Sequence, residues 1–445
     1  MTNWLSDRLK IAVIGTGISG LSAAWLLGGR HDVTIYEKAT RLGGHANTVD
    51  VPEEGGTIPV DMGFIVYNPQ TYPNLTAMFE HLEVPTRPSD MSFAVSLRNG
   101  SLEYAGTDLA GLFAQKRNIV SPRFWSMLKD LVRFYRDGTR AAQLSIPPVG
   151  TLGDYLAAGG YGEAFIRDHL LPMAAAIWST PCAAMLDHPA AAFLRFCDNH
   201  GLLRLTGRPE WRTVIGGSRS YVERLSRPLA DKVRLGEGVV RLRRYSGGVE
   251  VVGDSGGAEH YDHVVIATHA DQALAMLADP SDLEYSLLKA MSYAANDAIM
   301  HRDQSVMPKR RKVWSSWNYV GDGQEQSVCA TYFMNRLQRI GTSAPVLVTL
   351  NPRREIEAAS VIHRETYAHP VFDAAAMNAQ RRLWSLQGLR RTWYCGAYFG
   401  SGFHEDGLQA GLAVAETLGE VRRPWSVAGE SGRIGSGQPP AVIAA

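Results

Sequence analysis

The sequence predicts an α/β fold in which one parallel sheet is assembled from pieces at the start, the middle and the end of the chain. An apolar strand, a glycine-rich turn and an apolar helix occupy residues 10–27. Two further apolar runs, residues 261–268 and 392–396, have the composition of strands buried on both faces of a parallel sheet. Long stretches of different character separate these pieces, so we expect a second, interleaved α+β domain.

The opening segment has the pattern of a strand–helix–strand unit. Lys10–Ile14 is an apolar strand, residues 15–20 form the turn, and residues 21–27 form a helix that Gly28 and Gly29 end. Residues 32–36 form the second strand, and Glu37 lies at its end.

The turn carries the spacing Gly15-x-Gly17-x-x-Gly20. The first glycine permits a tight turn, the second lets a pyrophosphate approach the backbone, and the third allows close helix–strand packing. The amides of Ile18 and Ser19 would meet phosphate at the helix N-terminus. Glu37 can accept hydrogen bonds from both hydroxyls of a ribose. Because strand, helix and acid all agree in position, we predict a dinucleotide site.

A second glycine pair follows in the segment Arg41-Leu42-Gly43-Gly44-His45, shortly after Glu37 and Lys38. Two adjacent glycines let backbone amides meet a second part of a long cofactor, and Arg41 is available for phosphate. Residues 11–44 resemble the flavin-containing amine oxidase superfamily, which includes protoporphyrinogen oxidases and phytoene desaturases. The resemblance implies FAD, held by the glycine triplet, Glu37 and the second glycine segment. The usual segment ends in Arg, whereas this chain has His45.

Further blocks along residues 11–415 support the resemblance, including residues 61–64, 267–268, 395–398 and 401–411. They imply that the helix near Glu405 points its N-terminus at the flavin and that its amides stabilise negative charge on the reduced ring. The additional cofactor-binding residues implied are Gly63, Phe64, Val239, Gly396, Asp406, Gly407 and Leu408. Cys395 does not match the cysteine that carries covalent flavin in some relatives, so we expect noncovalent FAD.

The resemblance implies a three-layer, Rossmann-like FAD-binding domain with an interleaved α+β substrate domain, of the amine oxidase/phytoene desaturase type. We assign the FAD-binding domain to residues 1–69, 210–288 and 389–426. The substrate domain takes residues 70–209, which are helix-rich, and 289–388, which contain a mixed sheet with strands at residues 313–319, 327–333 and 346–350. Residues 427–445 are rich in Gly, Ser and Pro and are predicted to be a disordered tail.

Two longer stretches, residues 300–319 and 393–416, are similar to one bacterial branch of predicted NAD/FAD-binding proteins. Relatives of that branch are associated with cyclopropane-type fatty-acyl methyltransferases. The resemblance implies lipid metabolism: hydride transfer between flavin N5 and an apolar, fatty-acyl substrate, in the direction of a desaturase or a reductase. It also implies a lipid methyltransferase as a partner.

Two residues are candidates for the catalytic face. Phe403 falls where amine oxidases of the superfamily place a Tyr of their aromatic cage, and a Phe suits an apolar substrate better than an amine. His404 could exchange a proton at physiological pH or cap the helix. Trp178, Trp317, Asn318 and Tyr398 are candidate pocket lining, although each could equally be a core residue.

Three alternatives remain open. An amine oxidase using oxygen is disfavoured because Lys309 and Lys312, the lysines of the relevant segment, fall in a polar turn. The second is a redox-neutral flavin isomerase, and the third is a noncatalytic partner of the methyltransferase. Hydrolytic motifs are absent from the sequence, and the thirteen histidines show no metal-ligand spacing.

The composition limits the remaining classes. A net charge of +1 gives no support for nucleic-acid binding. Four scattered cysteines and an N-terminus without an apolar signal segment predict a cytoplasmic protein. No apolar run reaches the ~18 residues that a membrane helix requires, which leaves peripheral membrane contact open.

Overall fold

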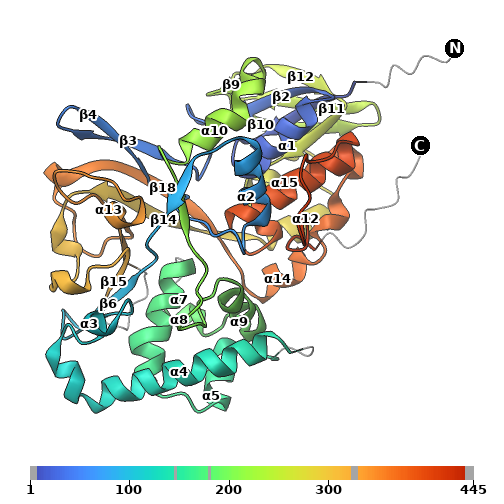
Figure 1. The fold of residues 1–445 in the computed structure, drawn as a ribbon. Coiled ribbons are helices and arrows are strands. Elements are labelled where there is room, and N and C mark those ends of the chain that lie inside the picture. Colours follow the sequence, from blue (N-terminus) through green and yellow to red (C-terminus); the bar gives the residue numbers. More distant parts are fainter. Residues whose placement is uncertain (1–7, 145–147, 179–181, 322–328, 436–445) are drawn as a thin grey trace.

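The computed structural model describes residues 8–144, 148–178, 182–321 and 329–435 (Figure 1). Its parallel sheet has the strand order β19-β13-β1-β2-β9. The strands are β1 (Lys10–Ile14), β2 (Asp32–Glu37), β9 (Val233–Leu235), β13 (His263–Ile266) and β19 (Thr392–Tyr394). The predicted α/β fold, with a parallel sheet built from three distant parts of the chain, is therefore confirmed.

Helix α1 (Ile18–Gly28) follows β1 and packs against β1 and β2. It begins at Ile18, three residues earlier than predicted, because Gly17 has an extended backbone and accepts the first helical bond from Leu21. Helix α15 (His404–Gly419) crosses α1 at Gly411, where an added Cβ would lie 2.2 Å from the carbonyl oxygen of Ser19. A larger residue at this position would push the two helices apart.

The antiparallel sheet β10 (Val239–Tyr245), β11 (Gly248–Gly253) and β12 (Ala258–Tyr261) contacts the parallel sheet through β11 on β13 and β12 on β1. Helices α1 and α15 supply the other layer (Figure 1). Apolar side chains of all three layers, such as Val13, Leu412 and Val251, belong to one buried core. This three-layer domain occupies the upper part of the view in Figure 1.

The second domain is built on a seven-stranded mixed sheet with the order β18-β14-β17-β16-β15-β6-β7. Its strands are β6 (Phe93–Leu97), β7 (Leu102–Ala105), β14 (Ser292–His301), β15 (Trp317–Gly321), β16 (Ala330–Phe333), β17 (Leu347–Leu350) and β18 (Val361–Val371). Strands β6 and β7 come from the segment that we predicted to be helix-rich. β6 pairs in parallel with β15, over 200 residues further along the chain, which ties the two parts of this domain together.

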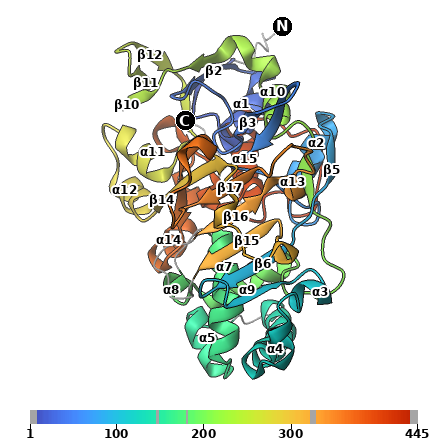
Figure 2. The same ribbon diagram turned by 90° about the vertical axis from the view of Figure 1, so that its left-hand side faces the viewer.

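Helices cover this sheet at the end remote from the three-layer domain, at the bottom of Figures 1 and 2. They are α3 (Leu109–Leu112), α4 (Pro122–Ala142), α5 (Leu152–Ala158), α6 (Glu163–Phe165), α7 (Leu171–Trp178), α8 (Cys182–Met185) and α9 (Ala190–Asn199), with a 3₁₀ turn at Lys116–Val120 before α4 and a π-helical turn at Ile166–Leu170 before α7. Phe134 of α4 and Phe193 of α9 are among the fully buried side chains of their common core.

Shorter elements complete the described chain. The remaining strands are β3 (Thr48–Glu53), β4 (Gly56–Asp61), β5 (Thr86–Pro88) and β8 (Arg212–Val214), paired as β3-β4 and β5-β8. The remaining α-helices are α2 (Pro73–His81), α10 (Arg219–Ser226), α11 (Ala270–Met276), α12 (Asp282–Lys289), α13 (Met334–Leu337) and α14 (Ala374–Gln380). None of the helices in the described chain combines the length and the apolarity that crossing a bilayer requires.

Two local predictions are wrong. The strand predicted at residues 313–319 begins only at Trp317, because the side chain of Asn318 bonds the amide and the carbonyl of Ser315 and holds a turn there. The tail predicted to be disordered is packed as far as residue 435. Arg433 donates to Asp406 and to the Thr71 carbonyl, and Ile434 is 1% exposed. Residues 436–445 lie outside the described part.

Candidate active site

One cavity of about 1770 Å³ extends from the glycine turn after β1 to helix α4 of the second domain. Pockets for one drug-sized ligand measure roughly 300–1000 Å³, so this cavity has room for a cofactor and a substrate together. Twelve of the eighteen predicted cofactor-binding residues line it: Gly15, Gly17, Ile18, Ser19, Glu37, Lys38, Gly44, His45, Gly63, Phe64, Val239 and Gly396. Both candidate catalytic residues, Phe403 and His404, also line it.

The three glycines of the turn have three different surroundings. Gly15 has φ +100°, and an added Cβ would lie 3.0 Å from the carbonyl oxygen of Ala267. At Gly20, which does not line the cavity, a Cβ would lie 2.0 Å from the Gly15 carbonyl oxygen. At Gly17 a Cβ would meet nothing within 4 Å, because the position faces the open cavity. The turn therefore leaves room for a ligand at Gly17 alone of the three.

The N-terminus of α1 is suited to phosphate. No side chain caps it, and its first turn contains no acid. Ile18 and Ser19 line the cavity at this end, so the helix dipole and the unpaired first-turn amides are available to an anion. Nearby, Glu37 accepts hydrogen bonds from the Thr16 amide (2.9 Å) and from the Ala39 amide (2.8 Å), which fix its carboxylate beside the glycine turn.

The second glycine segment lies against the glycine turn after β1, and the two together form a backbone cradle. Gly44 has φ +56°, and an added Cβ would lie 3.1 Å from the Cα of Gly17. Gly43, with φ +104°, lies behind it, where a Cβ would be 2.6 Å from the Ala46 carbonyl oxygen. Arg41 is held by the protein: it donates to the Gly44 carbonyl (2.8 Å) and pairs with Glu365 (3.6 Å). Neither Gly43 nor Arg41 lines the cavity, so the contact we predicted between Arg41 and phosphate stays a prediction.

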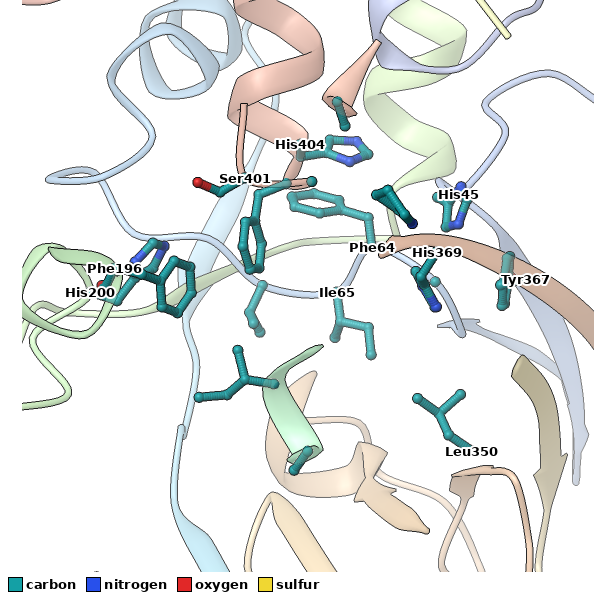
Figure 3. A pocket seen from close by; sticks show the side chains of 18 of the residues that line it. His45, Phe64, Ile65, Phe196, His200, Leu350, Tyr367, His369, Ser401 and His404 are labelled. Carbon is teal, nitrogen blue, oxygen red and sulfur yellow. Dashed lines mark hydrogen bonds between the residues drawn. The ribbon is translucent and has the colours of Figure 1, made fainter. Parts of the chain in front are cut away.

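His45 belongs to a group of aromatic side chains on the cavity wall. Its ring centroid lies 4.9 Å from that of Tyr367 and 5.4 Å from that of His369 (Figure 3). The centroid of His269 is 6.3 Å away. Burial, followed by the neighbouring histidines, lowers the pKa of His45 well below its usual value, and burial lowers the pKa of His369 to about 4. His45 is therefore neutral and does not replace the cation that an Arg would supply.

Two further residues of the cavity lining, Phe64 and His404, stack with ring centroids 3.8 Å apart (Figure 3). The Nε2 atom of His404 shares a hydrogen bond of 2.6 Å with the Tyr221 hydroxyl. Removal from bulk water lowers the pKa of His404 to about 3. Our expectation that His404 exchanges a proton at physiological pH is therefore not supported: its ring is neutral there, and its contacts fix it in place.

The start of α15 differs from the predicted arrangement. The Asp406 carboxylate accepts from the amides of Ser401 (3.0 Å) and Phe403 (2.9 Å), so it caps the helix. The Gly407 amide donates to the Phe403 carbonyl (3.1 Å). Asp406, Gly407 and Leu408 do not line the cavity, whereas the residues just before them, from Ser401 to His404, do. The helix begins one residue earlier than predicted, so its unpaired amides lie nearer His404.

The part of the cavity between Phe403 and α4, which we call the substrate half, is predominantly apolar. Phe403 stacks on Phe196 at 4.9 Å, and the wall continues to α4 through Met173, Ala176, Ile177, Leu128, Leu131 and Val132. Among the described residues that line the cavity, the acids are Glu37 in the cradle, Asp90 and Glu210. Asp90 is paired with Arg336 (2.8 Å) and Glu210 with Arg212 (2.6 Å). Neither carboxylate of the substrate half is therefore left without a cation.

Two histidines that the sequence did not indicate lie in this apolar wall. The His200 Nδ1–H donates to the Phe196 carbonyl (2.9 Å), and the His169 Nδ1–H donates to the Tyr104 hydroxyl (2.9 Å), which itself donates to the Asp168 carbonyl. Each Nε2 is buried and meets no partner among the described residues. Because burial lowers both pKa values to about 4, each presents an unprotonated nitrogen, a hydrogen-bond acceptor. The π-helical turn that carries His169 has no sequence signature.

Of the four residues predicted to line the pocket, two do so in the structure. Trp317 and Tyr398 line the cavity, whereas Asn318 does not and holds the Ser315 turn. The side chain of Trp178 lies outside the described part. Cys395 is fully buried and does not line the cavity. Burial raises the pKa of its thiol to about 12, so it is not a reactive thiolate.

Comparisons with known proteins identify the family and the fold to which this cavity belongs. The family described as flavin-containing amine oxidoreductases matches residues 18–336. A protein of Mycobacterium tuberculosis that carries the name flavin-containing monoamine oxidase AofH is 27% identical over 287 residues, which cover 62% of this chain and 60% of that protein. The match thus spans less than two thirds of that relative. A 4,4'-diapophytoene desaturase of Staphylococcus aureus is 43% identical over 72 residues, covering 16% of this chain and 14% of that protein.

Solved structures match nearly the whole fold. Cyclohexylamine oxidase from Brevibacterium oxydans has a TM-score of 0.67 at 16% identity, covering 93% of this chain and 100% of that one. A CLA-producing fatty acid isomerase from P. acnes has a TM-score of 0.65 at 17% identity, covering 94% of this chain and 99% of that one. At these identities the likeness establishes the two-domain fold and not the substrate.

Proposed function

This chain belongs to the flavin-containing amine oxidoreductase family, and we propose that it transfers a hydride between noncovalently bound FAD and an apolar, lipid-derived substrate. The single observation that supports an apolar substrate is the substrate half of the cavity. From Phe403 to α4 its wall is predominantly apolar, and the carboxylates that line it are already paired.

The described residues fit FAD. Gly17 and Gly44 leave a backbone cradle open to the cavity, and the first-turn amides of α1 suit its pyrophosphate. Glu37, fixed by two amides, suits its adenosine ribose, and Val239 lines the same end. Bound FAD supplies the hydride chemistry through its flavin ring. Phe64, His404 and Phe403 would enclose the reacting end and exclude water, because Phe64 stacks on His404 and Phe403 stacks on Phe196.

The second domain would hold the substrate by apolar contact and by a small number of hydrogen bonds. His169 and His200 provide acceptor nitrogens that fit a donor group, such as a hydroxyl, on an otherwise apolar chain. The name of one relative, the diapophytoene desaturase, supports polyene chemistry in this family. A fatty-acyl chain, taken either to or from a double bond, agrees with these features.

Anaerobic titration of the FAD-loaded protein with total lipid extract tests the proposal. We expect the oxidised flavin absorbance to bleach and mass spectrometry to find a lipid changed by two hydrogens. For the reductase direction, flavin reduced by dithionite should reoxidise on addition of the lipid extract. If no lipid fraction changes the flavin in either direction, the substrate proposal is wrong, although FAD binding would stand.

A second candidate is an amine oxidase, favoured by the match to the protein named monoamine oxidase AofH over 62% of this chain. Peroxide release from a panel of primary amines and polyamines discriminates between the two. We expect none, because no unpaired carboxylate among the described lining residues of the substrate half is available to an ammonium group. A lipid methyltransferase remains a proposed partner, and copurification of the two proteins tests it.

A further inference from the structure

We infer that the face formed by the 3₁₀ turn Lys116–Val120 and the outer side of α4 docks on an anionic phospholipid bilayer, so that the cavity opens toward the membrane. The inference rests on the proposed function for the origin of the substrate only. The docking itself is argued from exposed side chains of this face, of which Trp125, Val132 and Leu205 also line the outer part of the cavity.

Large apolar side chains are exposed on this face. Val120 is 79% exposed, Trp125 51% and Val132 52%, and Leu205 of a neighbouring loop is 60% exposed. Trp125 and Val132 are seven residues apart on α4 and therefore lie on one side of the helix. Contiguous exposed apolar patches on soluble proteins mark interaction sites, and Trp in particular favours the boundary between water and lipid.

The same face is basic. Residues 109–144 contain six exposed basic side chains: Lys116, Arg117, Arg123, Lys129, Arg136 and Arg140. Two of these are in ion pairs, Arg123 with Asp168 and Arg136 with Asp137. This stretch has no exposed acid, since Asp130 is buried and Asp137 is half-buried, and both are paired with arginines. The whole chain has a net charge of only +1, so the cations are concentrated here. A basic helix with exposed apolar residues fits an anionic membrane surface.

The cavity connects this face to the site. Trp125, Val132 and Leu205 are exposed and also line the cavity, and Leu128 and Tyr135 extend the lining along the same side of α4. The residues that would touch the bilayer are thus continuous with the apolar wall that leads to Phe403. Figures 1 and 2 both place α4 at the end of the molecule opposite the three-layer domain, where a flat surface can approach it. An acyl chain could pass from the bilayer into the cavity without crossing water.

The test is cosedimentation of the FAD-loaded protein with vesicles of phosphatidylcholine, with and without phosphatidylglycerol, and without any substrate. We expect binding only to the anionic vesicles, weakening as salt rises. Lys129→Glu/Arg140→Glu should reduce binding at least about tenfold, and Val120→Ser/Val132→Ser should reduce it at every salt concentration. The matched controls are Arg381→Glu/Arg382→Glu and Tyr285→Ser/Leu389→Ser, which change exposed residues of the same kinds elsewhere. They should bind like the wild type.

Absence of binding to anionic vesicles at low salt would overturn the inference, as would equal losses in the face variants and the controls. Size-exclusion chromatography gives the other contradicting outcome, a dimer that the Val120→Ser/Val132→Ser variant converts to monomer. Flavin bleaching by lipid dispersed in detergent is measured separately. Vesicle binding without bleaching would refute the proposed substrate and leave the docking intact, and bleaching without vesicle binding would do the reverse.

Discussion

The two ends of the cavity are lined differently, one by backbone and the other by side chains. The nucleotide end is made of backbone: Gly17 and Gly44 approach each other within a few ångströms, and the α1 amides have no side-chain cap. The reacting end is made of side chains, such as Phe403 on Phe196 and His404 on Phe64. At Gly20 and Gly44 an added Cβ would meet backbone atoms at 2.0 and 3.1 Å, whereas a side-chain site can be altered one residue at a time. Cofactor identity and substrate choice are therefore encoded in separate parts of the chain.

Gly17→Asp tests whether the backbone end of the cavity holds the pyrophosphate. An added Cβ at Gly17 meets nothing within 4 Å, and Asp is a better helix N-cap than Gly by roughly a few tenths of a kcal/mol. Its charge would face the pyrophosphate, and like charges ~4 Å apart near a protein surface repel by several kcal/mol. We expect FAD affinity to fall at least about a hundredfold, while thermal stability without FAD is unchanged or higher. Fluorescence titration with FAD and thermal unfolding measure the two effects.

Two variants make this result specific. Gly17→Asn adds nearly the same volume without the charge and should retain clearly more affinity than Gly17→Asp. Gly20→Ala places a Cβ 2.0 Å from the Gly15 carbonyl oxygen and should instead lower stability without FAD. Equal FAD affinity in the Asp and Asn variants would show that pyrophosphate does not lie at Gly17.

The same contrast explains what the sequence could predict. The glycine turn, Glu37 and the second glycine segment are contiguous in sequence, so their spacing alone indicated the cradle that the structure forms. His200 and His169 could not be predicted as acceptors, because the burial of each Nε2 without a partner is a property of the folded chain and has no sequence pattern. Strands β6 and β7 were missed for a related reason, since β6 is stabilised by a parallel partner in β15 that local patterns do not reveal.

Phe403→Ala alters the reacting end without touching the cradle. Removing the ring takes away its contact with Phe196 and part of the apolar wall, which we expect to weaken lipid binding by about 2 kcal/mol, or roughly thirtyfold. FAD affinity should change by less than about threefold, because the cradle is backbone. Phe333→Ala truncates a half-buried Phe that packs on Trp314 outside the cavity and serves as the control. If it weakened lipid binding equally, the loss would reflect general destabilisation.

A pH experiment probes the neutral histidines of the substrate half. The pKa of His200 in the folded protein, about 4, is below the ~6.5 of an unfolded chain, so the unfolded state binds its proton more readily. The stability that His200 contributes as a neutral group is complete above pH ~6.5 and is lost as the pH falls toward 4. His200→Asn keeps the donor to the Phe196 carbonyl, and denaturant unfolding at pH 7 and pH ~5 should show about 1–2 kcal/mol less acid destabilisation than wild type. The exposed His260→Asn is the control, and an unchanged acid loss in H200N would contradict a buried, neutral His200.

Cys395 lies in the FAD-binding domain but lines neither end of the cavity, so its substitution should change little. Its thiol is fully buried and does not line the cavity, and burial raises its pKa to about 12, so we expect no covalent bond to a flavin. Cys395→Ala should leave FAD affinity within about twofold of wild type and cost roughly 1 kcal/mol of stability through the lost sulfur contacts. Acid precipitation should release all flavin into the supernatant from both proteins. Flavin that stayed with the wild-type pellet and left the C395A pellet would mean that a side chain, and not the backbone cradle alone, holds the cofactor.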